Sequence, residues 1–166
     1  HRDVKVGDMD KGHAGLQLLK AIISTVPGVP CIYQGDEYGI PGANDPDNRD
    51  MMTFECENDY QVREFEQTKA LLHARRNSMP LNYGDLRTLY VDDQAWVFLR
   101  HYMGDWTIVA LNVRTDVKTI EVQLPAFAKC GNLETAVATE GADVRCLGDG
   151  KLEVTLPAYG YIIANK

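Results

Sequence analysis

The sequence predicts an α+β fold in which a mainly helical first half is followed by an antiparallel β-sandwich. Two stretches, 11–25 and 59–77, repeat apolar residues at helical spacing. From residue 86 onward the chain is rich in Val, Thr and Tyr, and turn signals recur about every 8–12 residues. The apolar fraction of 45% supplies enough side chains for a core of this kind.

The first predicted helix leads into one short predicted strand. Apolar residues along 11–25 form a single stripe, which consists of Leu18, Leu19, Ile22, Ile23 and Val26. Pro27 and Gly28 end this helix, and the apolar run 29–34, VPCIYQ, follows and stops at Gly35. A helix, a tight turn and a buried strand form an αβ unit, which is typical of parallel α/β folds.

The second predicted helix, 59–77, begins after Asn58, whose side chain can cap it, and Pro80 prevents its continuation. Its buried face is predicted to consist of Val62, Phe65, Leu71 and Leu72. Proline and glycine then punctuate the chain near 80–85. We therefore divide the chain into a first domain at 1–84 and an all-β domain at 85–166.

Short β-segments fill the second domain. They are predicted at 86–91, 95–102, 106–113, 117–124, 133–138, 144–147, 151–156 and 159–164. Apolar and polar residues partly alternate at 107–111 and 118–124, which is the pattern of an antiparallel sandwich with one face in water.

The net charge of −7 and the pI of about 5.0 argue against nucleic acid and anionic membranes as partners, because phosphate binding needs clustered Lys and Arg. No apolar stretch has the length of a membrane span, and a neutral ligand such as a sugar is compatible with the charge. The chain opens on His1 and Arg2 without Met, which is the expectation for an internal piece of a longer protein, so the compartment is not predicted.

Cysteine and histidine spacing predicts no metal site and no cofactor. Four scattered cysteines show no CxxC pair, and we expect partly buried free thiols, with a Cys130–Cys146 disulfide as the alternative. Three histidines, His13, His73 and His101, show no ligand spacing, so packed or solvated roles are expected.

The stretch from 35 to about 57 has no helical or strand pattern and holds a dense polar group at 44–49, NDPDNR. A loop of this length is usually functional when it is ordered, and the alternative is a disordered surface loop.

Two motifs here resemble the α-amylase family, glycoside hydrolase family 13. The stretch 28–39, GVPCIYQGDEYG, resembles the family's motif at the eighth barrel strand, with Gln34 in place of the commoner Tyr. The stretch 42–49, GANDPDNR, resembles the loop that follows, most closely in the neopullulanase and cyclomaltodextrinase branch. Weaker similarity continues at 80–85 and 156–161.

The resemblance implies that 1–84 is the tail end of a TIM (β/α)8 barrel, made of a helix, the eighth strand and the last helix. The spacing from Arg2 to Pro27 resembles that after the family's seventh-strand Asn-His-Asp motif, so the chain is expected to start just beyond it.

As function, the resemblance implies the C-terminal part of a retaining α-glucan hydrolase that acts on starch-derived linkages. The family's catalytic acids would lie upstream, so no catalytic residue is assigned and this chain alone is expected to be inactive. Asp36 and Glu37 are adjacent and diverge from a strand end, so they form no substitute pair.

Asp45 and Arg49 match family positions that hold a glucose unit, and the alternative is a salt bridge within the loop. Tyr33 and Glu37 either line the cleft or pack at the strand end.

Two other functions stay open at this point. One is a transglycosidase of the same family, and the other is a non-catalytic carbohydrate-binding module with Trp96 and Trp106 as its surface, although inward-facing tryptophans are commoner. The expected partner is an α-glucan oligosaccharide. Self-association through the exposed strand at 29–34 is a further expectation, and the alternative is that the two helices pack on the sandwich and leave this strand irregular. Calcium binding by the complete protein is left open.

Overall fold

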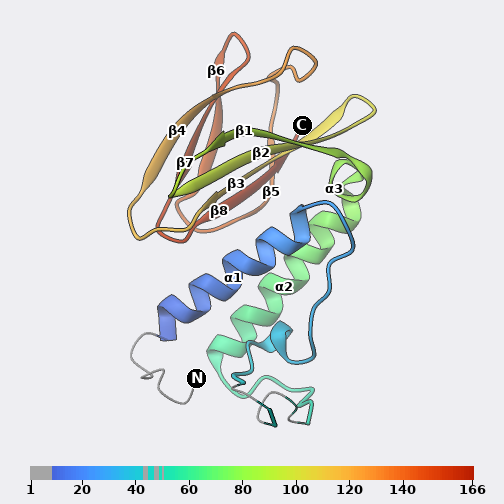
Figure 1. The fold of residues 1–166 in the computed structure, drawn as a ribbon, viewed down its shortest axis with the longest axis vertical. Helices are drawn as coiled ribbons and strands as arrows, with labels where there is room; N and C mark the ends of the chain where they lie inside the picture. The colour runs from blue at the N-terminus through green and yellow to red at the C-terminus, as the bar shows by residue number, and fades with distance from the viewer. Residues whose placement is uncertain (1–8, 43–44, 47–48, 50) are drawn as a thin grey trace.

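The computed structural model describes residues 9–42, 45–46, 49 and 51–166. Two sheets lie face to face, and helices cover the outer face of one of them (Figure 1). The first eight residues, and residues 43–44 and 47–48 of the polar loop, lie outside the described residues.

The two long helices form where the apolar spacing predicts them. Helix α1 spans Met9–Thr25 and α2 spans Asp59–Asn77, with a 3-10 turn, η1, at Asp36–Tyr38 between them. The Asn58 side chain caps α2 by accepting a hydrogen bond from the Gln61 amide at 3.0 Å. A short helix that the sequence pattern did not predict, α3, follows at Met79–Tyr83.

The predicted strand at 29–34 is wrong for this chain, because these residues have an irregular backbone. A strand needs a neighbour to satisfy its backbone donors and acceptors, and none of the described strands pairs with this segment. In the described chain the two helices pack on the sandwich and residues 29–34 stay irregular, which is the alternative expected in place of self-association through this strand.

The described strands form two antiparallel sheets. The large sheet has the order β1-β2-β3-β8-β5, and the small sheet has the order β4-β7-β6. The bounds are Asp85–Val91, Ala95–Tyr102, Asp105–Asn112, Lys118–Gln123, Glu134–Ala138, Asp143–Gly148, Lys151–Leu156 and Tyr161–Asn165 for β1 to β8. Each lies within about two residues of its predicted range, which confirms the antiparallel sandwich.

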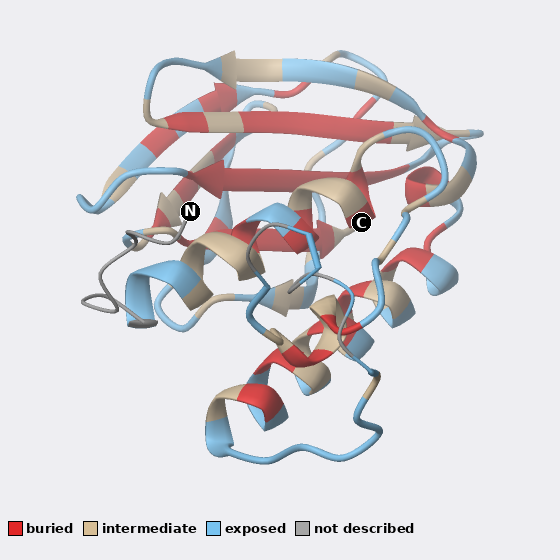
Figure 2. Cartoon of the chain, turned by 60° about the horizontal axis from the view of Figure 1, so that its bottom comes forward, coloured by how far each residue is buried: buried red, intermediate tan, exposed pale blue. Residues whose placement is uncertain are grey.

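The expectation of one wet face holds only for the small sheet. Strand β4 alternates between buried and exposed residues, whereas β3 is buried on both faces after its first residue. Figure 2 shows strands of the sandwich that are buried along most of their length, in red. One face of β3 packs in the core between the sheets through Ile108, and the other packs in a second core against the helices through Val109. The helices thus cover a face that the sequence assigned to water.

The helices bury fewer predicted residues than expected. Leu18 of α1 and Leu71 of α2 lie in the second core, but Leu19 is 53% exposed and Val62 is 46% exposed. No described helix has the length and apolarity to cross a membrane.

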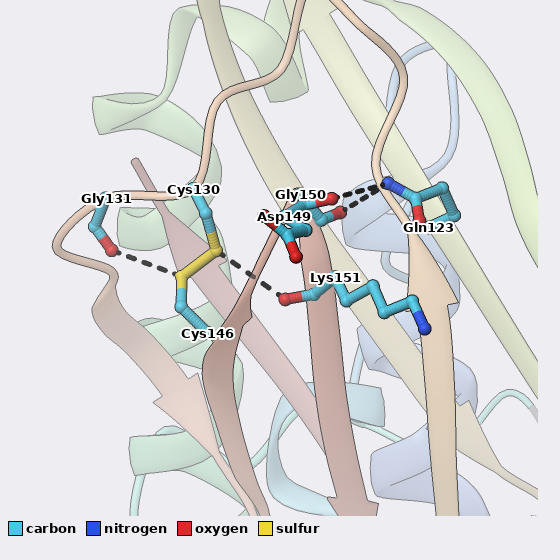
Figure 3. The surroundings of a disulfide bond; sticks show 7 residues. All are labelled: Gln123, Cys130, Gly131, Cys146, Asp149, Gly150 and Lys151. Atoms are coloured by element: carbon cyan, nitrogen blue, oxygen red, sulfur yellow. Dashed lines mark hydrogen bonds between the residues drawn. A yellow bond between two sulfur atoms is a disulfide. The ribbon is translucent and has the colours of Figure 1, made fainter.

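A disulfide joins Cys130 to Cys146, so the expectation of four free thiols is wrong for these two (Figure 3). It ties the connection between the sheets to β6, an edge strand of the small sheet. Nearby, the side-chain nitrogen Nε2 of Gln123 donates to the carbonyl oxygens of Asp149 and Gly150, each at 3.1 Å. These hydrogen bonds stabilise the turn between β6 and β7.

Candidate functional site

A compact turn follows the irregular segment, and glycines make it possible. Gly35 and Gly39 flank η1 with φ angles of 89° and 64°, a backbone region that favours glycine. The Gly35 carbonyl oxygen accepts hydrogen bonds from the amides of Tyr38 at 3.1 Å and Ile40 at 3.0 Å. The chain therefore reverses tightly here and presents Glu37 at a fixed point.

Tyr33 and Glu37, predicted as cleft-lining residues, line one pocket of about 400 Å³ between this segment and α2. The pocket wall consists of Ile32, Tyr33, Gln34, Glu37, Phe65, Thr68, Lys69, Leu72 and His73. Tyr33 is 54% exposed, and its amide donates to the Asp36 carboxylate at 3.3 Å. The Asp36 carboxylate therefore stabilises the turn through this hydrogen bond.

The Glu37 carboxylate has one buried oxygen, Oε2, that accepts no hydrogen bond from the described residues. A buried carboxylate oxygen without a donor is costly, so a water molecule or a ligand hydroxyl is its expected partner. Trp106 Nε1, in the core between the sheets, is also buried without a partner among the described residues, so cleft lining and packing both stay open for Glu37.

Asp45 and Arg49 form an ion pair within the loop, with 2.8 Å between Arg49 Nε and Asp45 Oδ1. The Arg49 amide also donates to the Pro46 carbonyl oxygen at 2.8 Å. Their side chains are 62% and 70% exposed, so both can be reached from solvent. Neither residue lines the pocket of Tyr33 and Glu37. The predicted site residues therefore lie at two places: Tyr33 and Glu37 line one pocket, and Asp45 and Arg49 form an ion pair outside it.

A buried polar cluster between α1 and α2 was not predicted. Lys20 and Glu64 are 2% and 1% exposed, and Lys20 Nζ lies 2.5 Å from Glu64 Oε2 and 3.0 Å from Thr68 Oγ1. The other carboxylate oxygen, Glu64 Oε1, contacts His13 Nδ1 at 3.1 Å and Gln17 Nε2 at 3.3 Å.

The sequence does contain a signal for this cluster. Polar residues recur at spacings of three or four along α1, at His13, Gln17, Lys20 and Ser24. A matching series runs along α2, at Gln61, Glu64 and Thr68. Two polar stripes at helical spacing predict two helix faces that pair with each other.

Neither tryptophan offers a sugar-binding surface. Trp106 is 1% exposed within the core between the sheets. Trp96 is half-buried, packs against Phe98 and donates from its indole nitrogen to Thr88 Oγ1 at 3.1 Å. A carbohydrate-binding module based on these two side chains is therefore wrong.

The histidines sit in separate surroundings. His13 stacks on Tyr60 with 4.6 Å between ring centroids, His73 lines the pocket at Tyr33, and His101 packs against Phe127. Over the described ranges, no three side chains of His, Cys, Asp or Glu converge as metal ligands.

Two known proteins are similar to this chain over most of its length. Neopullulanase 2 of Thermoactinomyces vulgaris is 34% identical over 144 residues, which are 85% of this chain and 24% of that protein. A cyclomaltodextrinase of Geobacillus thermopakistaniensis is 31% identical over 163 residues, which are 95% of this chain and 25% of that protein. The chain belongs to the α-amylase family.

Structural comparison agrees with this family. A debranching enzyme of Nostoc punctiforme superposes with a TM-score of 0.78 at 30% identity, over 92% of this chain and 31% of that chain. The match covers the C-terminal region of these proteins, and the chain spans about a quarter of the length of the curated relatives. No family model matches the chain. Membership confirms the resemblance carried by the motifs at 28–39 and 42–49.

Proposed function

We propose that this chain is the C-terminal part of a retaining α-glucan hydrolase, to which it contributes a sugar-binding loop. In this proposal, residues 1–84 complete a (β/α)8 barrel, residues 85–166 form the C-terminal β domain, and the catalytic acids come from upstream. The observation that carries the proposal is the exposed Asp45–Arg49 pair on the loop that follows the barrel-strand motif.

The chemistry of this pair suits a glucose unit. A carboxylate offers two acceptor oxygens and a guanidinium offers paired donors, so each can hold neighbouring sugar hydroxyls. An exposed ion pair contributes only about 0–1 kcal/mol, so a sugar can displace part of it at little cost. The salt bridge within the loop and the binding of sugar are therefore compatible.

Exposed apolar residues support the barrel part of the proposal. Val29 is 93% exposed and Leu19 is 53% exposed, although both belong to segments with apolar patterns. In a barrel, upstream strands would pair with 29–34 and cover these side chains.

Substitutions in the complete protein test the sugar-binding loop. Asp45→Ala or Arg49→Ala is expected to weaken the use of long maltooligosaccharides more than short ones, by roughly 10- to 150-fold in kcat/KM, because each change removes a charge-assisted hydrogen bond worth roughly 1.5–3 kcal/mol. The matched control is the exposed Asp93–Arg114 pair on the β domain, changed to Ala in the same way. Wild-type kinetics on every chain length would make the loop structural only.

Product analysis tests the reaction class. With the catalytic acids upstream, this chain alone is expected to release no sugar from starch, pullulan or cyclodextrins, whereas the complete protein is expected to release reducing ends. Elongated oligosaccharides as the main products would instead identify a transglycosidase. Turnover by a pure preparation of this chain would contradict the placement of the acids.

A further inference from the structure

The turn that carries Glu37 is seated on the buried cluster between α1 and α2. A methyl group added at Gly39 would lie 2.9 Å from Glu64 Cγ and 3.4 Å from His13 Cε1, so the Gly39 backbone is in direct contact with the Glu64 side chain. Next to it, the Tyr38 ring stacks on Phe65 with 5.1 Å between centroids. Two consecutive turn residues therefore lie on two consecutive residues of α2.

Hydrogen bonds from α1 hold the Glu64 side chain of α2 in one orientation. Lys20 binds one carboxylate oxygen, and His13 and Gln17 contact the other. Lys20 itself is held by Thr68, one turn along α2. A carboxylate fixed at both oxygens gives the turn a rigid contact surface, which a flexible apolar side chain would not provide.

A role in positioning explains why this pair is ionic. Buried ion pairs often contribute little net stability, since an apolar pair of similar volume packs as well without the cost of desolvation. Their directional hydrogen bonds, however, fix geometry. We infer that Lys20 and Glu64 are positioning residues that set the place of the turn at 35–39, and through it of Glu37 and the loop to Asp45 and Arg49. This inference depends on the proposed function of that loop.

The test replaces the pair by apolar residues of similar length in the complete protein. The double variant Lys20→Met/Glu64→Met keeps the volume and leaves no unpaired buried charge. We expect its thermal unfolding midpoint to stay close to wild type, its KM for maltoheptaose to rise about tenfold, and its kcat for maltotriose to stay unchanged. The matched control is Lys11→Met/Glu66→Met, which makes the same changes at exposed positions of the same helices.

Gly39→Ala provides an independent second variant. It leaves the ion pair intact but forces the turn away from Glu64, and it strains a backbone with φ of 64°. The same rise in KM for maltoheptaose is expected. If either variant folds and keeps the wild-type KM for maltoheptaose, the positioning role is wrong.

Arg49→Ala in the same assay separates this inference from the proposed function. If Arg49→Ala raises the KM for maltoheptaose while folded variants of the pair do not, only the positioning role fails. If Arg49→Ala leaves the KM unchanged, the sugar-binding function of the loop fails, and the positioning role fails with it.

Discussion

Arg100, on β2, donates a hydrogen bond from its buried guanidinium to the carbonyl oxygen of Thr25 at the end of α1. Its Nε and Nη2 donate to the Gly84 carbonyl oxygen at 3.2 and 2.8 Å. From α2, Arg75 binds the neighbouring carbonyl oxygens of Ser24 and Val26 at 2.9 and 3.1 Å. Burial lowers the pKa of both guanidiniums from a high ordinary value. The sandwich and the two helices therefore meet at the carbonyl end of α1.

Removing this link is expected to destabilise the chain strongly. Arg100→Met leaves the carbonyl oxygens of Thr25 and Gly84 without their donor, which should lower the free energy of unfolding by roughly 3 kcal/mol. Arg100→Lys should restore only part of the loss, since a single ammonium cannot replace the planar fork. Denaturant unfolding measures both values. Arg87→Met, at an exposed site on β1, should change stability by less than about 0.5 kcal/mol; equal effects at both sites would refute the link.

The disulfide is expected to stabilise the sandwich. It closes a loop of 16 residues, for which the chain-entropy relation gives about 3 kcal/mol. Cys130→Ser should therefore lower the free energy of unfolding by about this amount, whereas Cys56→Ser, at an exposed cysteine that the structure leaves unpaired, should have little effect. Alkylation of the denatured, unreduced protein should modify Cys31 and Cys56 but not the bonded pair. Modification of all the cysteines would show that the bond does not form.

The hairpin between β1 and β2 is expected to weaken in acid. Hydrogen-bond donors around Asp92 hold the pKa of its carboxyl well below the ordinary value; they are the Tyr90 hydroxyl, the Lys118 ammonium and the amides of Ala95 and Gln94. Because the folded pKa is depressed, the stabilisation is complete above about pH 4, the unfolded value, and is lost as the pH falls through the folded pKa.

An Asp92→Asn variant measures this contribution. Its stability deficit against wild type should be constant above about pH 4 and should shrink as the pH falls further. NMR titration of the Asp92 carboxyl carbon checks the direction of the shift independently. Asp93→Asn, at the exposed neighbouring residue, is the control. An Asp92 that titrates in the ordinary range would contradict the hydrogen-bonded arrangement.

The sequence correctly predicts those helices and strands whose packing partners lie within this chain. Asn58 and Pro80 mark the limits of α2 locally, and the turn dipeptides mark the strands of the sandwich. The strand at 29–34 fails for the opposite reason, because its pattern is that of a buried strand whose neighbours are not among the described strands. The apolar pattern of a segment indicates that it can form a strand. The strand forms only when a neighbouring strand pairs with its backbone.

Contacts between distant segments were harder to predict. From its position beside an apolar stripe, Lys20 is expected to lie on the surface. It is buried because the polar stripe of α2 lies opposite and provides Glu64 as its partner. The choice between free thiols and a Cys130–Cys146 bond likewise depends on which loops meet in space. The assignment of Asp45 and Arg49 as sugar-binding residues rests on the motif at 42–49, and this role stays a prediction.

Amide hydrogen exchange at 29–34 tests the central claim, that the first part of this chain is the end of a barrel completed by upstream residues. In this chain alone, the amide of Ile32 should exchange fast, while Val109 in β3 should be strongly protected. In the complete protein, Ile32 should become as protected as Val109, because barrel strands would pair with its segment on both sides. Fast exchange of Ile32 in the complete protein would contradict the barrel assignment, and so would strong protection of Ile32 in a dilute monomer of this chain.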